Sequence, residues 1–449
     1  MGISKVSNRW LNRTYKCIAI FLVIFAVLIS ALRLFLPYAH NYREDLQNYI
    51  NTTYQSDIVI GALNMGWQSS GPTLQAENVS LLQTDGSEVY IQAFDINIDF
   101  WKSIRFRRLI TKDFTLDGVK ILFDEKMLAN NANSEQNTKL INSVTELFLK
   151  QIGQFSVKNS QVIYLKDNSK HTFLISQIDW LNQGKSHRAH GNVILDGLTS
   201  NNLQVKLDLQ GRRLADMKGV IHLDANRLNI TPWLDQVLVI DNENTHSTVN
   251  FNAWLSVEKG SAKTLQVALG NNQIAWQHQD SIRTLNIDQG QILFQHLDKP
   301  ENLQITSSDI QISSNEQTWA PLNVDIKKVN QETQGFISTL DIAGLADLLP
   351  LVIEKPEARL LIDELDPVGT MNNVFFKFAN EQFSTVAQFT DFNSQFSNGI
   401  PGIENVNGEI IYSDQQLQVD FNASDGALNF DKHFKAPIVY QQLASTIMM

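Results

Sequence analysis

The chain has 449 residues, of which 36 are Lys or Arg and 47 are Asp or Glu, giving a formal net charge of −11. This acidic balance argues against a surface that binds nucleic-acid phosphates. The single cysteine, Cys17, excludes an intramolecular disulfide and a zinc site built from cysteines. With 43% hydrophobic residues the chain can bury a core, and its length permits about three average domains or one extended all-β body.

An apolar run predicts a transmembrane helix at residues 17–36, which contain one charged residue, Arg33, near their end. The run matches the ~20 residues that cross ~30 Å of hydrocarbon. The segment 1–16 before it is basic, so the positive-inside rule places the N-terminus in the cytoplasm. A cleaved signal peptide is the alternative, but the run is long for a signal and lacks a clear Ala-x-Ala site. Apolar residues at helical spacing then predict a membrane-proximal helix at 37–55.

Apolar and polar residues alternate along much of the region 56–449, which is typical of strands with one buried and one solvated face. The alternation is strict in Phe94–Phe100 and Leu203–Leu209. It is looser in Ile221–Ala225, Phe336–Ile342 and Leu417–Phe421. Half-exposed strands of this kind favour an antiparallel sheet.

Turn-forming pairs lie between the predicted strands and suggest hairpins. They occur at Thr84-Asp85-Gly86, Asp117-Gly118, Asp196-Gly197, Asn398-Gly399 and Asp425-Gly426. Three similar segments, Phe114–Phe123, Phe155–Tyr164 and Leu285–Phe294, each read as strand, tight turn, strand. Their similarity fits either an internal repeat or chance likeness among hairpins.

Helices that could cover such a sheet are few and short. The candidates are Ser143–Ile152, Pro232–Leu238 and Leu345–Leu351, and a polar loop is predicted near residues 128–140. These helices cannot bury the apolar faces of so many strands. The sheet must therefore curl over its own apolar face or leave that face to a ligand.

Catalytic and metal-binding signatures are absent from the sequence, so no catalytic residue, metal or cofactor is predicted. His187 and His190 would point to opposite faces of a strand, and solvated loop histidines are the favoured interpretation. The acidic group Asp363, Glu364 and Asp366 could serve a glycan hydrolase, but a solvated turn before Pro367 is favoured. The basic run 102–108 could contact anionic headgroups, although a solvated strand edge is preferred.

Two segments carry a resemblance to a known family. After the apolar run come Ile58-Val-Ile-Gly61, Trp67 and the stretch Gly71–Leu81. Near the other end, Gly399–Ile411 contains the pattern P-G-x-x-N-x-x-G and is followed by Leu417–Phe421 and Phe434–Pro437. This arrangement resembles the AsmA-like proteins of Gram-negative envelopes, and within them the YhdP family.

The resemblance implies a bridge-like lipid-transfer protein: a long, twisted antiparallel sheet, curled into an apolar groove, in which phospholipid acyl chains move between membranes. The expected fold is thus mostly β, with an N-terminal transmembrane helix and a few short helices. The expected function is non-enzymatic: an inner-membrane, single-pass protein, mainly periplasmic, that contributes to phospholipid transport to the outer membrane and to envelope integrity. The apolar residues expected to bind acyl chains are Phe94, Ile96, Ile98, Phe100, Leu203, Val205, Leu207, Leu209, Leu417, Val419 and Phe421.

The chain departs from the family in length, since family members are much longer, and this predicts a truncated product or a fragment. Phospholipids and the inner membrane are the expected partners, with a further outer-membrane or periplasmic protein and no nucleic acid. The alternative function is a structural or assembly factor that docks outer-membrane proteins by β-strand addition and holds no lipid.

Overall fold

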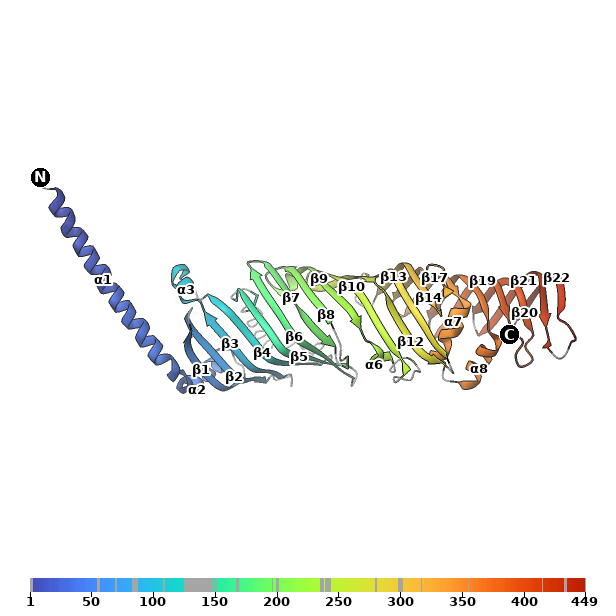
Figure 1. Ribbon diagram of the computed structural model, residues 1–449, viewed down its shortest axis with the longest axis horizontal. Helices are drawn as coiled ribbons and strands as arrows, with labels where there is room; N and C mark the ends of the chain where they lie inside the picture. The colour runs from blue at the N-terminus through green and yellow to red at the C-terminus, as the bar shows by residue number, and fades with distance from the viewer. Residues whose placement is uncertain are drawn as a thin grey trace. The chain divides into compact units, whose positions relative to one another are not determined.

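The computed structural model describes residues 3–54, 57–68, 71–82, 88–107, 110–124, 148–149, 152–166, 169–195, 197–198, 202–234, 238, 244–278, 281–297, 302–315, 317–353, 355–413, 415–431 and 434–448. These residues form 22 strands and few helices, which confirms the mostly β fold class (Figure 1). The chain divides into two compact units. Unit 1 comprises Met1–Val193 with Gly211–Arg213, and unit 2 comprises Ile194–Gln210 with Leu214–Met449.

Unit 1 begins with a long helix, α1 (Ile3–Phe35), followed by the 3₁₀ helix η1 (Leu36–Tyr42) and by α2 (Arg43–Tyr54). By length and composition, one helical segment of the described residues, Arg13–Thr53, is apolar enough to cross a membrane, and its apolar window is wholly exposed. Most of η1 and all of α2 lie in the segment 37–55, where a membrane-proximal helix was predicted.

Most consecutive strands of unit 1 pair in antiparallel fashion, and one pair is parallel. They are β1 (Asp57–Gln68), β2 (Gly71–Leu82), β3 (Glu88–Ile98), β4 (Thr111–Asp124), β5 (Gln154–Lys166), β6 (Ser169–Gln183) and β7 (Ser186–Leu195), with helix α3 (Phe100–Phe106) after β3. The pair β4–β5 is parallel, which corrects the expectation of a purely antiparallel sheet. The connection between these two strands is long enough for the crossover that a parallel pair needs.

Helix α2 covers the outer edge of β1. Asn51 donates from Nδ2 to the carbonyl of Ile58 (2.9 Å) and accepts from its N–H (2.8 Å). One turn earlier, Gln47 accepts from the N–H of Ile60 (3.0 Å), and Arg43 donates to the carbonyl of the same residue (3.1 Å). The three side chains lie four residues apart on one helix face, and they satisfy backbone groups that a bare edge strand would leave open to other chains.

Asn51→Ala is expected to lower the free energy of opening this strand edge by about 1–2 kcal/mol, because the N–H and the carbonyl of Ile58 both lose their hydrogen-bond partner. Amide hydrogen exchange at Ile58 should become about tenfold faster, since ~1.4 kcal/mol corresponds to a factor of ten. Asn48→Ala is the matched control, because Asn48 is exposed on the same helix and the gain in helix propensity is the same. Equal exchange rates in the two variants would contradict the capping role of Asn51.

All described strand pairs of unit 2 are antiparallel. The strands are β8 (Asn202–Gln210), β9 (Lys218–Leu228), β10 (His246–Glu258), β11 (Ser261–Leu269), β12 (Asn272–His278), β13 (Ser281–His296), β14 (Leu303–Ser314), β15 (Gln317–Thr318), β16 (Val324–Val329), β17 (Glu332–Asp341), β18 (Val368–Ala379), β19 (Gln382–Ser394), β20 (Gly402–Ser413), β21 (Gln416–Asn429) and β22 (Ile438–Met448). The helices are η4 (Leu214–Asp216), α6 (Thr231–Leu234), α7 (Ile342–Leu348), η6 (Leu349–Leu351) and α8 (Pro356–Leu365).

Single residues with a left-handed backbone interrupt many strands in mid-length. They include Asn78 in β2, Gly118 in β4, Asn159 in β5, Asp309 in β14, Asp391 in β19, Asn405 in β20 and Asp425 in β21, with φ between 46° and 64°. Asn, Asp and Gly tolerate this conformation best. In β19 and β20 a neighbouring asparagine supports it: the N–H groups of Asp391 and Asn405 donate to the side-chain oxygens of Asn407 and Asn393, each at 2.9 Å.

Several predicted turns are such interruptions. Asp117-Gly118 and Asp425-Gly426 lie inside β4 and β21, so their prediction as hairpin turns is wrong. The three similar segments are likewise parts of the continuous strands β4, β5 and β13. Asn398-Gly399 does form a turn, closed by Ser397 and Ile400. The turn at Thr84-Asp85-Gly86, and Asp196 of another, lie outside the described residues.

The interruptions shift the inward-facing positions by one residue. Ala76 and Val79 share one buried cluster although three positions separate them, and the left-handed residue Asn78 lies between them. Phe389 and Phe392 share another cluster across Asp391. Alternation therefore holds on either side of each interruption and changes phase across it, which keeps one face of the sheet apolar along the whole strand.

The short helices were predicted in part. Leu345–Leu351 lies within α7 and η6, and α6 begins the predicted segment Pro232–Leu238. The predicted loop at 128–140 and most of the predicted helix at 143–152 lie outside the described residues. Helices α3 and α8 were not predicted.

Candidate functional site

The candidate site is a groove of about 730 Å³ in unit 2, between the sheet strands β18–β22 and the helices α7 and α8.

 Its lining is apolar apart from Ser394 and Ser445, and none of the described residues that line it is charged. The lining residues are Ile342, Leu345, Ala346, Leu349, Ile362, Leu365, Pro367, Met371, Phe389, Phe392, Ser394, Ile400, Pro401, Ile403, Val406, Ile410, Val419, Phe421, Leu428, Leu443, Ser445 and Ile447. A concave apolar surface of this size matches sites that hold small apolar ligands.

Strand register brings the sheet side of the groove together. Ile410 of β20 lies opposite Val419 of β21, and Phe421 lies opposite Gly408. Position 408 requires glycine, because a Cβ atom there would overlap the ring of Phe389 on the neighbouring strand. The glycine thus allows the Phe389 ring to lie over the backbone of β20 and face the groove.

The opposite face of the same strands is more polar. Between Val419 and Phe421 in sequence, Asp420 accepts hydrogen bonds from Thr446 Oγ1 and Gln418 Nε2, each at 2.6 Å. The hydrogen bond from Thr446, and to a smaller extent the one from Gln418, holds the pKa of the Asp420 carboxyl below its usual value. The two faces of β21 therefore differ in chemistry, and the apolar face is the one that lines the groove.

Helices α7 and α8 supply the other side of the groove. Ile342, Leu345 and Leu349 come from α7 and η6, and Ile362 and Leu365 come from α8. Helix α7 contacts β14, β17 and β18. Short helices thus cover part of the apolar face at the groove.

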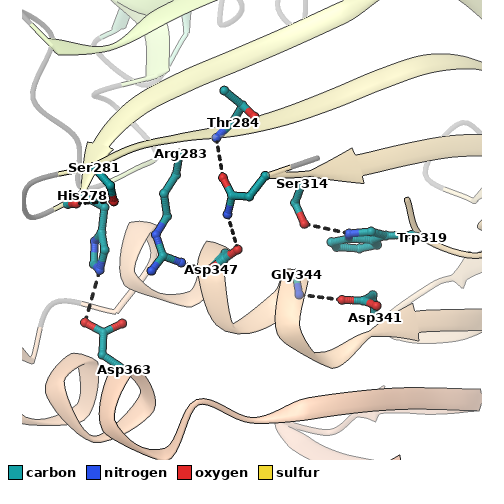
Figure 2. A network of polar contacts seen from close by, with 11 residues as sticks. His278, Ser281, Arg283, Thr284, Ser314, Trp319, Asp341, Gly344, Asp347 and Asp363 are labelled. Carbon is teal, nitrogen blue, oxygen red and sulfur yellow. Dashed lines mark hydrogen bonds and ion pairs between the residues drawn. The ribbon is translucent and has the colours of Figure 1, made fainter. Parts of the chain in front are cut away.

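Polar contacts fix α7 against the sheet (Figure 2). Asp347 on α7 pairs with Arg283 of β13 and accepts from Asn315 Nδ2, and the Asn315 side-chain oxygen accepts from the N–H of Thr284 at 2.9 Å. At the start of the helix, Asp341 Oδ1 accepts from the N–H of Gly344 at 2.7 Å, which is an N-cap interaction. Helix α7 is therefore held at both ends.

Asp363 and Glu364, which the sequence analysis placed in a solvated turn, lie in helix α8 and help to hold it, so the turn was wrong for these two, although Glu364 and Asp366 are exposed as expected. His278 Nε2 of β12 lies 3.2 Å from Asp363 Oδ2, as Figure 2 shows. Ser397 Oγ donates to Glu364 Oε2 at 2.5 Å. Asp366 adopts the left-handed conformation that ends the helix, and its N–H donates to the carbonyl of Ile362. The carboxyls of Asp363 and Glu364 thus have structural partners.

Of the predicted lipid-binding residues in unit 2, Val419 and Phe421 line the groove. Leu417 is half-buried opposite Tyr412 and is not among the lining residues. In β8, Leu203 and Leu209 are buried, at 7% and 8% exposure. Val205 and Leu207, between them, are half-buried opposite Leu223 and Ile221 of β9. Lipid binding by these four residues of β8 stays a prediction.

The predicted residues of unit 1 have different surroundings. Phe94 and Ile96 pack against the buried cluster that contains Phe114, and the Phe94 and Phe114 ring centroids lie 6.2 Å apart. Ile98 ends β3 and is half-buried. Phe100 is the first residue of α3, so the strand predicted at Phe94–Phe100 ends two residues early. Lipid contact at these positions also stays a prediction.

The helix residues of the groove were missed by sequence reasoning. In α8, Pro356 occupies a helix-start position, and Ile362 and Leu365 follow at helical spacing. This pattern is short and lies beside an acidic group that suggested a turn. The sequence thus contained the signal for a helix, but only the packing of α8 over the sheet shows that its residues line the groove.

His187 and His190 lie on β7, not in a loop as the sequence analysis favoured. His187 is buried, with Nδ1 at 2.6 Å from Asn182 Oδ1 and Nε2 at 3.0 Å from the carbonyl oxygen of Gly211. His190 is exposed, at the opposite face of the strand. In the part of the chain that the structure describes, no group of three His, Cys, Asp or Glu side chains could hold a metal ion.

The chain matches a known protein family over nearly its whole length. The family model described as "YhdP protein" matches residues 1–448. The chain is 23% identical to the intermembrane phospholipid transporter YhdP of Escherichia coli (strain K12), over 96% of this chain and 35% of the relative. It therefore spans about a third of the length of that relative. Since the match covers nearly every residue, the chain belongs to the YhdP family.

Proposed function

We propose that this chain is a non-enzymatic, inner-membrane protein that binds phospholipid acyl chains in the groove between β18–β22 and the helices α7 and α8. Residues 17–36 would cross the membrane once, and the strands would lie in the periplasm of a Gram-negative bacterium. In this role the chain contributes to phospholipid transport to the outer membrane and so to envelope integrity.

The observation that carries the proposal is the uncharged lining of the groove. Moving an acyl chain from water to an apolar surface gains about 0.8 kcal/mol for each buried CH₂ group. Such binding needs no specific polar contact, so a headgroup can stay in water while the chain is bound. A lining without charges favours this class of ligand over sugars, nucleotides or peptides, which need polar partners.

The relative named above is a phospholipid transporter, which supports phospholipid as the ligand. Because this chain spans about a third of that relative, transfer over the full distance between two membranes is proposed for the longer protein. For this chain we propose acyl-chain binding and the membrane anchor.

Site-specific photo-crosslinking in cells tests the proposal on β21. A photoreactive residue at Val419 or Phe421 should form phospholipid adducts, because both side chains line the groove. The same residue at Gln418 or Asp420, on the polar face, should form none and serves as the matched control. Absence of lipid adducts at all four positions would overturn the proposal. Adducts to a protein alone would favour the assembly factor that docks by strand addition.

A further inference from the structure

A second surface suited to lipid lies in unit 1, on the short helix α3. Asp99 caps its start, since Oδ1 accepts from the N–H of Lys102 at 3.0 Å, and Arg107 ends it in the left-handed conformation. Ser103 Oγ accepts from the N–H of Ile110 at 2.9 Å and donates to the carbonyl of Asp99 at 2.7 Å. These bonds hold the helix against the segment that leads into β4. The basic run therefore forms a helix and not the strand edge expected from the sequence.

Helix α3 exposes large apolar side chains. Trp101, Ile104 and Phe106 are 60%, 49% and 58% exposed. Trp101 and Ile104 lie three residues apart on one side of this seven-residue helix, an exposed apolar pair of the kind that marks an interaction surface, and helical spacing places Phe106 on another side. The intervening Lys102 and Arg105 are exposed too, as is Arg107 at the end of the helix. Lys and Arg together with Trp, Phe or Leu on one short helix are the residue types found in helices at a membrane interface.

Ring contacts place this helix beside the apolar helix α1. The ring centroid of Phe25 in α1 lies 6.5 Å from that of Phe100 and 6.0 Å from that of Trp101. Eight residues further along α1, the Arg33 guanidinium lies over the ring of Trp67, 5.9 Å from its centroid. The Trp67 ring in turn lies 5.1 Å from that of Phe100. The start of α3 and the end of β1 therefore lie along the last third of α1.

The spacing of residues along α1 indicates how deep each of them lies in the membrane. Eight residues of helix rise about 12 Å, and half of the hydrocarbon core is about 15 Å thick. If α1 spans the membrane as the proposed function states, Arg33 lies near the far interface and Phe25 lies well inside the hydrocarbon. Phe25 then lies near the midplane. Because Phe100 contacts both Phe25 and the Trp67 ring beneath Arg33, the start of α3 lies between the midplane and the non-cytoplasmic interface.

We propose that α3 is embedded in the leaflet on the non-cytoplasmic side of the membrane that α1 crosses. Trp101, Ile104 and Phe106 contact acyl chains, and Arg105 and Arg107 reach anionic headgroups with their long side chains, whereas Lys102 pairs with Asp99 at 2.9 Å. This inference rests on the membrane anchor of the proposed function and adds a second membrane contact, on the sheet. The partner is a phospholipid surface, and anionic phospholipids are favoured over neutral ones.

Spin-label accessibility on the full chain in liposomes tests the proposal. In a Cys17→Ser background, which removes the only cysteine, labels are placed at Ile104→Cys, at Val23→Cys in α1 and at Glu77→Cys, exposed on β2. In vesicles of phosphatidylethanolamine and phosphatidylglycerol, labels at 104 and 23 should collide with oxygen and lose collisions with a nickel chelate. The label at 77 should show the reverse. A label at 104 that behaves like the label at 77 would overturn the proposal, and so would a label at 23 that stays in water.

The preference for anionic headgroups has its own test. Replacing phosphatidylglycerol by phosphatidylcholine should move the label at 104 toward water, and the double variant Arg105→Gln, Arg107→Gln should abolish this dependence on lipid charge. Equal depth in both lipids for the unchanged helix would overturn the preference for anionic headgroups. Photo-crosslinking on β21 reports on the groove independently, so lipid adducts there with a water-exposed label at 104 would refute this inference alone.

Discussion

Ile410→Lys is expected to lower the yield of phospholipid adducts at position 421 about tenfold or more, whereas Ile411→Lys leaves it unchanged. Ile410 lines the groove, and its strand partner is Val419. The change removes an apolar contact and places a charge on a surface without a countercharge. Full burial of an isoleucine side chain, here by the acyl chain, is worth about 1.5–3 kcal/mol, and a factor of ten needs only ~1.4 kcal/mol.

Ile411 is a close control for this variant. It is the next residue of β20, is half-buried like Ile410, and points to the other face, where it lies opposite Val386 of β19. Any general effect of lysine on the stability of β20 should therefore appear in both variants. The adduct yield at position 421, measured by mass spectrometry, separates the two faces. Equal yields in the two lysine variants would show that the groove does not hold the acyl chain.

The fold class could be predicted because period-two alternation depends on local sequence. Leu203–Leu209 forms β8, as its strict alternation indicates. Leu417–Phe421 likewise lies in β21. The pattern reports which face of each strand is apolar, but it does not report what packs on that face. Buried residues such as Leu203 and groove residues such as Val419 therefore look the same in sequence.

The mid-strand interruptions misled the sequence analysis for a physical reason. Asn, Asp and Gly favour left-handed backbone both in tight turns and inside bulged strands, so Asp425-Gly426 carries the same local signal in either case. The distinguishing feature is an apolar pair three residues apart around the left-handed residue, as in Ile403 and Val406 around Asn405. A turn reverses the chain after such a residue, whereas here alternation resumes with shifted phase.

Gly344→Val is expected to displace α7 and disorder one side of the groove. Gly344 is buried, and a Cβ atom at this position would overlap the Trp319 indole. The indole has little freedom to move, because Nε1 donates to Ser314 Oγ at 2.9 Å and the Trp319 N–H donates to the carbonyl of Ile312 at 2.9 Å. The helix must therefore yield, and overpacking of this kind costs about 1–3 kcal/mol.

The displacement should reach the ligand, because Leu345 and Ala346 follow Gly344 directly and line the groove. Amide exchange in α7 should become faster, and lipid adducts at position 421 should decrease. Ala343→Val is the control, since it introduces the same β-branched residue on the same helix at a half-buried position. If Gly344→Val left both exchange and adduct yield at the level of Ala343→Val, the close packing of α7 on Trp319 would not be what shapes the groove.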